Sequence, residues 1–151
     1  MEYEQLKLEN QLCFPFYAVS RLIIRAYQED LDRLGITYPQ YLVLMVLWEK
    51  DGISVNEITE KLILNTNTVT PLLKRMEAMQ LITRTPSTMD QRKIIIQLTS
   101  QGWAMRESAA EIPLKLMNKL NLEASDVQIA EALHLKNKLY ELIKVLDKSS
   151  N

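Results

Sequence analysis

Residues 53–98, ISVNEITEKLILNTNTVTPLLKRMEAMQLITRTPSTMDQRKIIIQL, decide the fold of this 151-residue chain. They begin with a capping box, because the Ser54 hydroxyl can accept a hydrogen bond from the Glu57 amide while the Glu57 carboxylate reaches back to the Ser54 amide. A short helix is predicted to follow, since the apolar residues Ile58 and Leu62 recur at helical spacing on one face.

A second helix is predicted after the turn-forming run Leu64-Asn65-Thr66-Asn67. Proline is tolerated in the first turn of a helix, where its missing amide has no intrahelical partner, so Pro71 places the start near Thr68–Thr70. The alternative is that the helix includes a preceding turn at the cost of a kink. The helix is expected to end near Met79. Its inward face is predicted to consist of four apolar residues, Val69, Leu72, Leu73 and Met76.

Two β-rich runs come next, Leu81–Thr85 and Lys93–Leu98, separated by the polar loop 86–92. Two short helices followed by a hairpin with a basic tip are typical of a winged helix-turn-helix, in which the second helix enters the major groove of DNA. The alternative is a three-helix core with a solvated hairpin. The pattern favours a DNA-binding module.

Short polar side chains and cations occupy the positions that would face DNA. Arg92 can enter a minor groove, where the negative potential is strongest when the groove is narrow, and Lys74 and Arg75 are expected to contact phosphates. The candidate DNA-binding residues are Asn65, Thr66, Asn67, Thr68, Thr70, Lys74, Arg75, Asp90, Arg92 and Lys93.

The charge distribution agrees with such a module, although the whole chain has a formal charge of −1. Residues 53–99 carry six basic and four acidic side chains, whereas the rest of the chain carries 12 basic and 15 acidic ones. This asymmetry fits a DNA-facing module on an acidic scaffold.

The rest of the chain is predicted to be mostly helix, so the fold class is mainly α. A helix from Pro15 to Leu34 is expected to end at Gly35, and the next helix begins at Pro39 and ends at Asp51-Gly52. The apolar residues predicted to be buried in that second helix are Leu42, Leu44, Met45, Val46 and Leu47.

Two further helices are expected after the hairpin. Thr99-Ser100 caps a helix over about 101–120, in which Pro113 demands a kink or a break. The run Ser125-Asp126-Val127-Gln128 is another capping box, and the last helix continues to about Asp147. Its apolar stripe consists of Leu133, Leu139, Leu142, Ile143 and Leu146.

The terminal helices have more apolar surface than a small winged domain can cover. We therefore expect them to pack against a second copy, in a homodimer that binds a pseudo-palindromic duplex; the alternative is an intramolecular bundle. The predicted organisation is a single domain over 1–151, with the winged helix-turn-helix at about 38–99 and dimerisation helices at about 8–35 and 100–148.

Composition argues against several other classes. The acidic N-terminus, Met1-Glu2-Tyr3-Glu4, is unlike a signal peptide, and the longest apolar run, Tyr41–Trp48, is shorter than the roughly 20 residues that span a bilayer. The single cysteine fits a reducing cytoplasm. His134 is the only histidine, and the sequence has no Gly-rich phosphate loop, so we expect no metal, no cofactor and no enzyme.

Several motifs together resemble a known family. The wing residues 90–92, DQR, and the flanking helices resemble MarR-type transcriptional regulators along nearly the whole chain. Residues 8–17, LENQLCFPFY, and 36–42, ITYPQYL, are similar to the organic-hydroperoxide-sensing repressors of the OhrR type, as are 72–77, LLKRME, and 81–84, LITR. The resemblance implies a repressor whose reduced N-terminal cysteine accompanies DNA binding and whose oxidation by organic peroxide releases the operator.

The resemblance also implies that Cys13 is the sensor, with Tyr17, Tyr27 and Tyr38 at the family's tyrosine positions. One departure is the run 65–67, NTN, where relatives often carry an acidic residue and a glycine, which concerns the operator sequence. The residues themselves support a reactive Cys13, because unpaired amides at a helix N-terminus favour the thiolate. The alternative for a lone cysteine is a small buried hydrophobe.

The distance along the first helix separates Cys13 from one of these tyrosines. A helix rises about 1.5 Å per residue, which puts Tyr27 roughly 21 Å from Cys13. The hydroxyl of Tyr27 can therefore serve only the thiol of a partner subunit, if the two first helices cross antiparallel.

The fate of an oxidised Cys13 follows from the cysteine count. Without a second cysteine, we expect organic hydroperoxide to give a sulfenic acid that an external small-molecule thiol caps. Two other functions stay open. One is a MarR-type repressor that a small aromatic or lipophilic ligand releases, with Cys13 inert, and the other is a thiol peroxidase in which Cys13 turns over.

Overall fold

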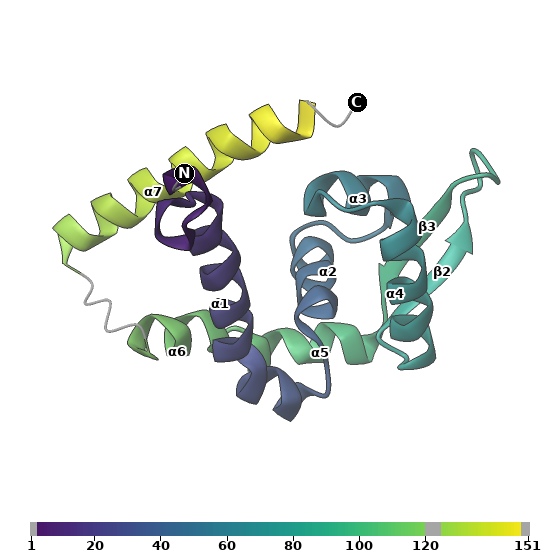
Figure 1. Cartoon of the computed structure of the whole chain (residues 1–151). Coiled ribbons are helices and arrows are strands. Elements are labelled where there is room, and N and C mark those ends of the chain that lie inside the picture. The colour runs from purple at the N-terminus through teal and green to yellow at the C-terminus, as the bar shows by residue number, and fades with distance from the viewer. Residues whose placement is uncertain (1–2, 120–124, 149–151) are drawn as a thin grey trace.

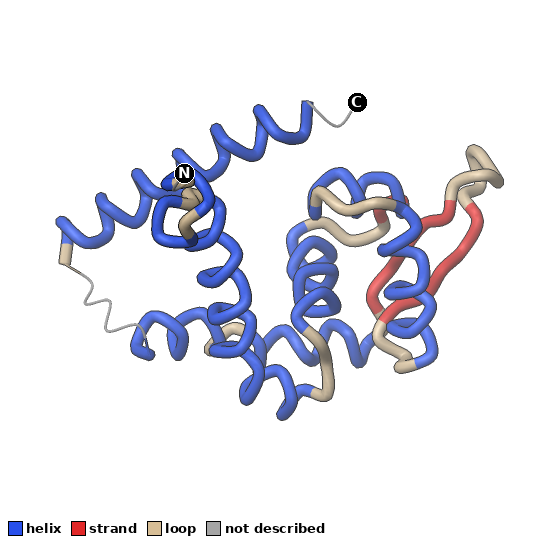
Figure 2. The backbone as a smooth tube through the Cα atoms, viewed as in Figure 1, coloured by secondary structure: helices blue, strands red, loops and turns tan. Residues whose placement is uncertain are grey.

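The computed structural model describes residues 3–119 and 125–148. Helices make up most of it, and a small sheet lies at one end (Figure 1, Figure 2). The elements in chain order are η1 (Glu4–Leu6), η2 (Leu8–Asn10), α1 (Cys13–Leu34), α2 (Tyr38–Glu49), β1 (Ile53–Ser54), α3 (Val55–Leu62), α4 (Thr66–Ala78), β2 (Ile82–Pro86), β3 (Ile94–Leu98), α5 (Ser100–Ala109), α6 (Ile112–Lys119) and α7 (Asp126–Lys148). The predicted class, mainly α with a winged helix-turn-helix, is confirmed.

The winged module consists of α3, α4 and the β2–β3 hairpin, and Figure 2 shows the hairpin projecting beyond the helices. All strand pairs are antiparallel in the order β1-β3-β2, and Arg84 on β2 lies opposite Ile96 on β3. The short strand β1 pairs Ile53 with Ile96. This strand was not predicted, because two residues are too few to show an alternating pattern.

The hydrophobic core is built around α2, which contacts α1, α3, α4 and α5. Two of its predicted core residues are not fully buried, since Leu42 is half-buried and Met45 is 37% exposed. Tyr41 and Val43 are buried instead. The prediction was wrong here because α2 is covered on several sides, so its apolar periodicity does not single out one inward face. The remaining predicted core residues, Leu44, Val46 and Leu47, are buried.

Most of the predicted helix ends are confirmed. The capping box at Ser54 forms, Gly35 ends α1 with a φ of +69°, and the Thr99 side chain caps α5. The break expected at Pro113 occurs just before it: α5 ends at Ala109, and Pro113 is the second residue of α6. Proline is accepted there because the first amides of a helix have no intrahelical partner.

The start of α4 corrects a prediction. The helix begins at Thr66 rather than near Thr68–Thr70, so Pro71 lies inside it. Because proline has no amide, the Asn67 carbonyl lacks its usual donor four residues later. The lost hydrogen bond and the clash of the proline ring with that carbonyl together cost about 3 kcal/mol, whereas each large apolar side chain buried on the inward face contributes about 1.5–3 kcal/mol. The four predicted residues, Val69, Leu72, Leu73 and Met76, are all buried and so hold the helix together.

A close backbone contact joins α5 to the winged module. A Cβ on Gly102 would overlap the Leu81 carbonyl oxygen and lie 2.9 Å from Leu98 Cδ2. The Gly102 carbonyl accepts a hydrogen bond from Trp48 Nε1 at 3.0 Å, and the Leu81 carbonyl accepts one from the Thr99 amide at 3.1 Å. The first turn of α5 therefore has one tightly fitted position.

Apolar side chains on α1 and α7 are exposed in the single chain. In Figure 1, α7 runs across the N-terminal end of α1, and its C-terminal end extends toward the side on which α2 and α3 lie. Of the predicted stripe, Leu133, Leu142 and Leu146 are exposed, whereas Leu139 and Ile143 are half-buried. The large exposed apolar residues of α1 are Phe14, Phe16, Tyr17, Val19, Leu22 and Ile24.

The capping box expected at Ser125 forms in part, because the Ser125 hydroxyl accepts the Gln128 amide at 3.3 Å, while Gln128 Oε1 has no hydrogen-bond partner within residues 3–119 and 125–148. The expected end of an earlier helix at Leu120 lies outside the described residues. No helix in the described part of the chain is long and apolar enough to cross a membrane.

Candidate DNA-binding surface and thiol site

The N-terminal end of α4 presents its polar residues outward. Asn65 is the N-cap residue, and Thr66, Asn67 and Thr68 are exposed, while Thr70 is half-buried. Their outward direction follows from the helical period, because the buried residues of α4 occupy the opposite face. Further along the same helix, the predicted phosphate-binding residues Lys74 and Arg75 are also exposed.

The turn of the wing is held by two side chains. The Ser87 hydroxyl accepts the amides of Met89 and Asp90 at 3.2 and 3.4 Å. Asp90 Oδ1 accepts both the amide of Arg92 at 3.1 Å and its Nε at 3.3 Å. Apart from this contact with Asp90, the Arg92 side chain faces solvent, and 92% of its surface is exposed. Asp90 thus orients Arg92 within the wing.

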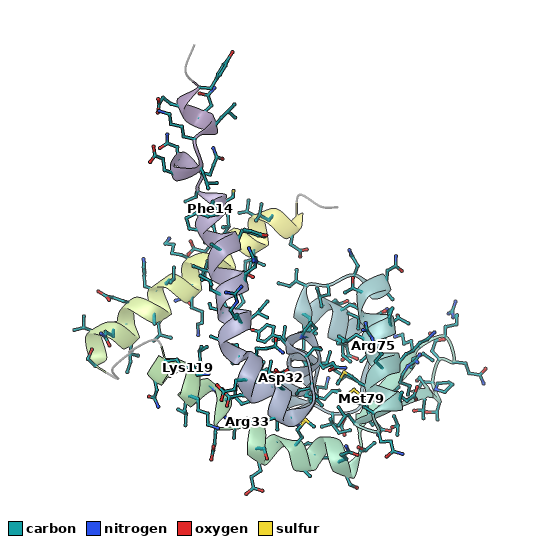
Figure 3. The ribbon with its side chains drawn as sticks, turned by 60° about the horizontal axis from the view of Figure 1, so that its bottom comes forward. Phe14, Asp32, Arg33, Arg75, Met79 and Lys119 are labelled. Atoms are coloured by element: carbon teal, nitrogen blue, oxygen red, sulfur yellow. The ribbon has the colours of Figure 1, made fainter. Side chains whose placement is uncertain are left out.

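A groove of about 200 Å³ lies between the N-terminal end of α4 and the wing. It brings together Thr66 and Thr70 of α4 with Arg92 and Lys93 of the wing. Its polar and basic lining residues are Ser54, Asn56, Thr66, Thr70, Arg84, Arg92 and Lys93. Among the predicted residues it does not include, Lys74 and Arg75 lie farther along α4; Figure 3 labels Arg75 on that helix.

Arg84 is a groove residue that the candidate list lacks. The strand period places Arg84 on the same face of β2 as the buried Ile82, which is the face toward α4. Its amide and Nη1 both donate to Glu77 of α4, at 3.2 and 3.5 Å. Alternation along the strand was the signal that could have identified it. Asn56 and Ser54 were also absent from the list.

Cys13 is exposed and is the first residue of α1. The helix begins there without a side-chain cap from Leu12, and Figure 3 labels the neighbouring Phe14 at this end of α1. One turn later, the Tyr17 hydroxyl accepts from Arg21 Nη1 at 3.5 Å, and the Arg21 guanidinium lies 5.3 Å from the Tyr17 ring centre. Cys13 therefore lies at the N-terminus of α1, as the sequence predicted, and the amide of the next residue, Phe14, donates to the Gln11 carbonyl at 3.3 Å.

Three tyrosines form a separate cluster between α1 and α2. The ring centres of Tyr27 and Tyr38 are 5.2 Å apart, and Tyr41 lies 6.1 Å from Tyr27 and 6.4 Å from Tyr38. Burial raises the pKa of all three hydroxyls above the ordinary tyrosine value, and the neighbouring phenols raise those of Tyr27 and Tyr41 further. The phenols are therefore protonated donors at neutral pH. Tyr41 was not predicted as part of this group.

The predicted redox residues thus fall into two groups within one chain. Cys13 and Tyr17 lie at the start of α1, whereas Tyr27, more than three helical turns after Cys13, packs against Tyr38 at the start of α2. A straight helix separates Cys13 from Tyr27 by roughly 21 Å.

A buried carboxylate joins α1 to α6. Asp30 is 8% exposed and lies 3.5 Å from both Lys115 Nζ and Lys119 Nζ, and 3.8 Å from an Arg33 nitrogen. Figure 3 labels Arg33 and Lys119, which flank this cluster. Asp30 also lines a pocket of about 510 Å³ between α1, α5 and α6. In the described part of the chain, no group of three His, Cys, Asp or Glu side chains could hold a metal ion.

Comparisons with known proteins agree with this arrangement. A family model described as the transcriptional regulator SarA/Rot matches residues 25–108. The organic hydroperoxide resistance transcriptional regulator of Bacillus subtilis (strain 168) is 42% identical over 145 residues, which cover 96% of this chain and 95% of that protein. The HTH-type transcriptional regulator SarZ of Staphylococcus aureus is 38% identical over 130 residues, which cover 84% of this chain and 88% of SarZ.

A solved structure is similar over almost the whole chain. Reduced AbfR bound to DNA, a protein known from Staphylococcus epidermidis, has a TM-score of 0.79 and 38% sequence identity, and the match covers 97% of this chain and 99% of that one.

Proposed function

Since this chain belongs to the MarR-type transcriptional regulators, in the branch that contains the organic hydroperoxide resistance regulator, we propose that it is a homodimeric DNA-binding repressor that senses organic hydroperoxides through Cys13. The observation that carries this function is the shared exposed surface of α4 and the wing, where threonines, asparagines and cations lie together. Double-stranded DNA is the partner that such a surface fits, with α4 in a major groove and Arg92 in the adjacent minor groove. Because the named relatives are bacterial proteins, a DNA partner would place the action of this chain in the cytoplasm.

The exposed apolar faces of α1 and α7 support the homodimer. Large side chains such as Phe16, Leu22 and Leu133 are between 42% and 57% exposed, and burying each of them contributes on the order of 1 kcal/mol or more. A second copy provides a matching surface, because a two-fold interface pairs the same patch on both subunits. Two α4 helices related by this symmetry bind successive half-sites of a pseudo-palindromic operator.

An antiparallel crossing of the two α1 helices would complete the thiol site. It brings the hydroxyls of Tyr27 and Tyr38 of one subunit toward Cys13 of the other. These phenols stay protonated at neutral pH because burial raises their pKa, so they donate hydrogen bonds that stabilise a thiolate. Tyr17 lies one turn from Cys13 on its own helix and belongs to the same site.

The sensing reaction is an oxygen transfer followed by a thiol exchange. The Cys13 thiolate attacks the peroxide O–O bond, which breaks, so that sulfur becomes a sulfenic acid and the hydroperoxide is reduced to its alcohol. A small-molecule thiol then attacks the sulfenic sulfur, forms a disulfide and releases water. The enlarged side chain displaces α1, and the two α4 helices lose the spacing that fits successive major grooves.

The test uses a duplex selected by the protein from a random pool. Binding is measured with and without cumene hydroperoxide for wild type and for Cys13→Ser. We expect peroxide to release wild type while Cys13→Ser stays bound. Unmodified Cys13 in protein already released by peroxide would overturn the proposal. Equal release of both proteins by a phenolic ligand would favour a ligand-gated repressor, and repeated turnover of peroxide by Cys13 would favour a peroxidase.

A further inference from the structure

The groove between α4 and the wing gathers positive charge from separate elements. Arg84 comes from β2, and Arg92 and Lys93 come from the wing, while Thr66 and Thr70 add hydroxyls from α4. Within the described part of the chain, none of the residues that line it is acidic. A groove of this composition favours an anion with several oxygen acceptors.

Arg84 is the groove residue with unused hydrogen-bonding capacity. Its side chain is only 20% exposed, and its ion pair within the described residues is a 3.5 Å contact from Nη1 to Glu77 Oε2. Its Nε is buried and has no hydrogen-bond partner among the described residues. A guanidinium carries five donors, and removing such a group from water is unfavourable unless acceptors replace the lost water. Arg84 therefore keeps a buried donor, Nε, that no described residue satisfies, although Glu77 pairs with its Nη1.

The geometry of a duplex identifies a partner for that donor. One sugar–phosphate strand separates a major groove from the adjacent minor groove. The proposed function places α4 in the major groove and Arg92 in the minor groove. The sugar–phosphate strand of the DNA must then cross the protein surface between α4 and Arg92. That surface is the cationic groove. We infer that the groove binds one backbone phosphate of the operator and that Arg84 is its principal ligand.

This contact would set the position of the protein on DNA without reading its sequence. Phosphates are identical at every base pair, so the contact fixes register and adds affinity uniformly. An arginine suits the site because its planar fork can donate two parallel hydrogen bonds to a phosphate. Glu77 holds the same guanidinium before DNA arrives and so competes with the phosphate. The carboxylate is thus expected to weaken DNA binding while it orients Arg84.

The first experiment compares Arg84→Ala with Arg106→Ala, which removes an equal charge from an exposed position on α5. We expect Arg84→Ala to bind the selected duplex about tenfold or more weakly, with unchanged sequence preference and a salt slope smaller by about 1. Arg106→Ala should bind like wild type. Thermal unfolding of each variant establishes that the loss is not a folding defect.

A second variant keeps Arg84 in place. Glu77→Gln frees the guanidinium from its carboxylate, so DNA affinity should rise severalfold in the wild-type background. The same substitution should have little effect when Arg84 is already alanine. Equal gains in both backgrounds would show that Glu77 acts only by its general charge, and would overturn the assignment to Arg84.

Neutral methylphosphonate linkages, introduced one at a time, locate the phosphate. We expect one linkage that weakens wild type about tenfold but leaves the affinity of Arg84→Ala unchanged. If no linkage behaves this way, or if inorganic phosphate occupies the groove while every linkage is equivalent, the inference is wrong. Failure of wild type to bind any duplex would instead count against the proposed function itself.

Discussion

Asp90 and Arg92 form a closed unit at the turn of the wing. A single oxygen, Asp90 Oδ1, accepts the Arg92 amide at 3.1 Å and the Arg92 Nε at 3.3 Å. A carboxylate on a DNA-facing surface repels phosphates, so its presence needs a reason. The reason is that it holds the side chain of an exposed arginine in one direction before DNA is met.

This relationship predicts that removing a negative charge from the wing weakens DNA binding. Asp90→Ala should lower operator affinity even though the wing becomes more positive, because Arg92 loses its orientation. Arg92→Ala should weaken binding by at least about 1 kcal/mol. Both are measured by fluorescence anisotropy on a labelled duplex, and the Arg92→Ala/Asp90→Ala double variant should bind no more weakly than Arg92→Ala. Tighter binding by Asp90→Ala would refute the positioning role.

Lys74 is predicted to contact phosphate rather than a base. It is exposed on α4, beyond the polar N-terminal end of the helix. Lys74→Ala should weaken binding to all duplexes by a similar factor and reduce the salt slope by about 1. Titrations at several salt concentrations, on the selected duplex and on one with scrambled half-sites, check both. A variant with changed sequence preference and an unchanged slope would place Lys74 at a base edge instead.

The capping box of α3 predicts a pH dependence of stability. The pKa of Glu57 is lowered, chiefly because the Ser54 amide donates to its carboxylate, then because the Ser54 hydroxyl does so, with Lys50 adding to the effect. A group whose pKa is lower in the folded state stabilises above its unfolded pKa, about 4.3, and this stability disappears as the pH falls through the folded value.

Glu57→Gln should therefore be less stable than wild type at pH 7, and the difference should shrink in acid below about pH 4. Urea unfolding at both pH values measures it. The matched control is Glu60→Gln on the exposed side of the same helix, whose difference from wild type should stay small at both pH values.

Gln80 predicts a simple stabilising substitution. It is exposed at the turn after α4 and adopts a left-handed backbone with a φ of +59°. Such a conformation costs an L-residue roughly 1–2 kcal/mol, which glycine avoids. Gln80→Gly should raise the free energy of unfolding by about 0.5–1 kcal/mol, which is less than the strain removed, because the greater freedom of glycine in the unfolded chain offsets part of the gain. Gln80→Ala keeps the strain and should give no such gain. Denaturant titrations distinguish the two.

The tyrosine cluster predicts a kinetic effect on sensing. Phenylalanine preserves the ring contacts of Tyr27 and Tyr38 at 5.2 Å but removes the hydroxyl donors. Tyr27→Phe or Tyr38→Phe should therefore slow peroxide-induced release while leaving DNA affinity in the reduced state unchanged. Stopped-flow oxidation followed by DNA release measures both. Release rates equal to wild type in both variants would exclude these hydroxyls from the thiol site.

Local signals carried most of what the sequence could predict. The capping box at Ser54 and the inward face of α4 depend on residues a few positions apart, and both appear in the structure. The start of α4 was placed too late because Pro71 normally marks the first turn, whereas tertiary burial of the helix outweighed that preference. Met45 was misplaced for a similar reason, since α2 is covered from several sides.

The long-range parts of the site were harder to predict. Strand alternation places Arg84 on the same face as Ile82, but only the packing of β2 on α4 and the pairing with Glu77 bring its side chain into the groove. Tyr41 joins Tyr27 through the packing of α2 on α1. Whether Cys13 meets these phenols depends on a second subunit. The sequence of one chain indicates such an assembly only through the apolar stripes of its terminal helices, and these do not specify which residues meet across the interface.

The tight fit at Gly102 makes the orientation of α5 sensitive to this one position. Any side chain there must push α5 away from the Leu81 carbonyl, and α5 is followed by α6, which contacts α1, one of the helices proposed to join the subunits. A small change in the tilt of α5 near Gly102 displaces the far end of α6 by a larger distance. A substitution at Gly102 would therefore change the distance between the two α4 helices of the proposed dimer, and with it the spacing of the operator half-sites that the dimer binds.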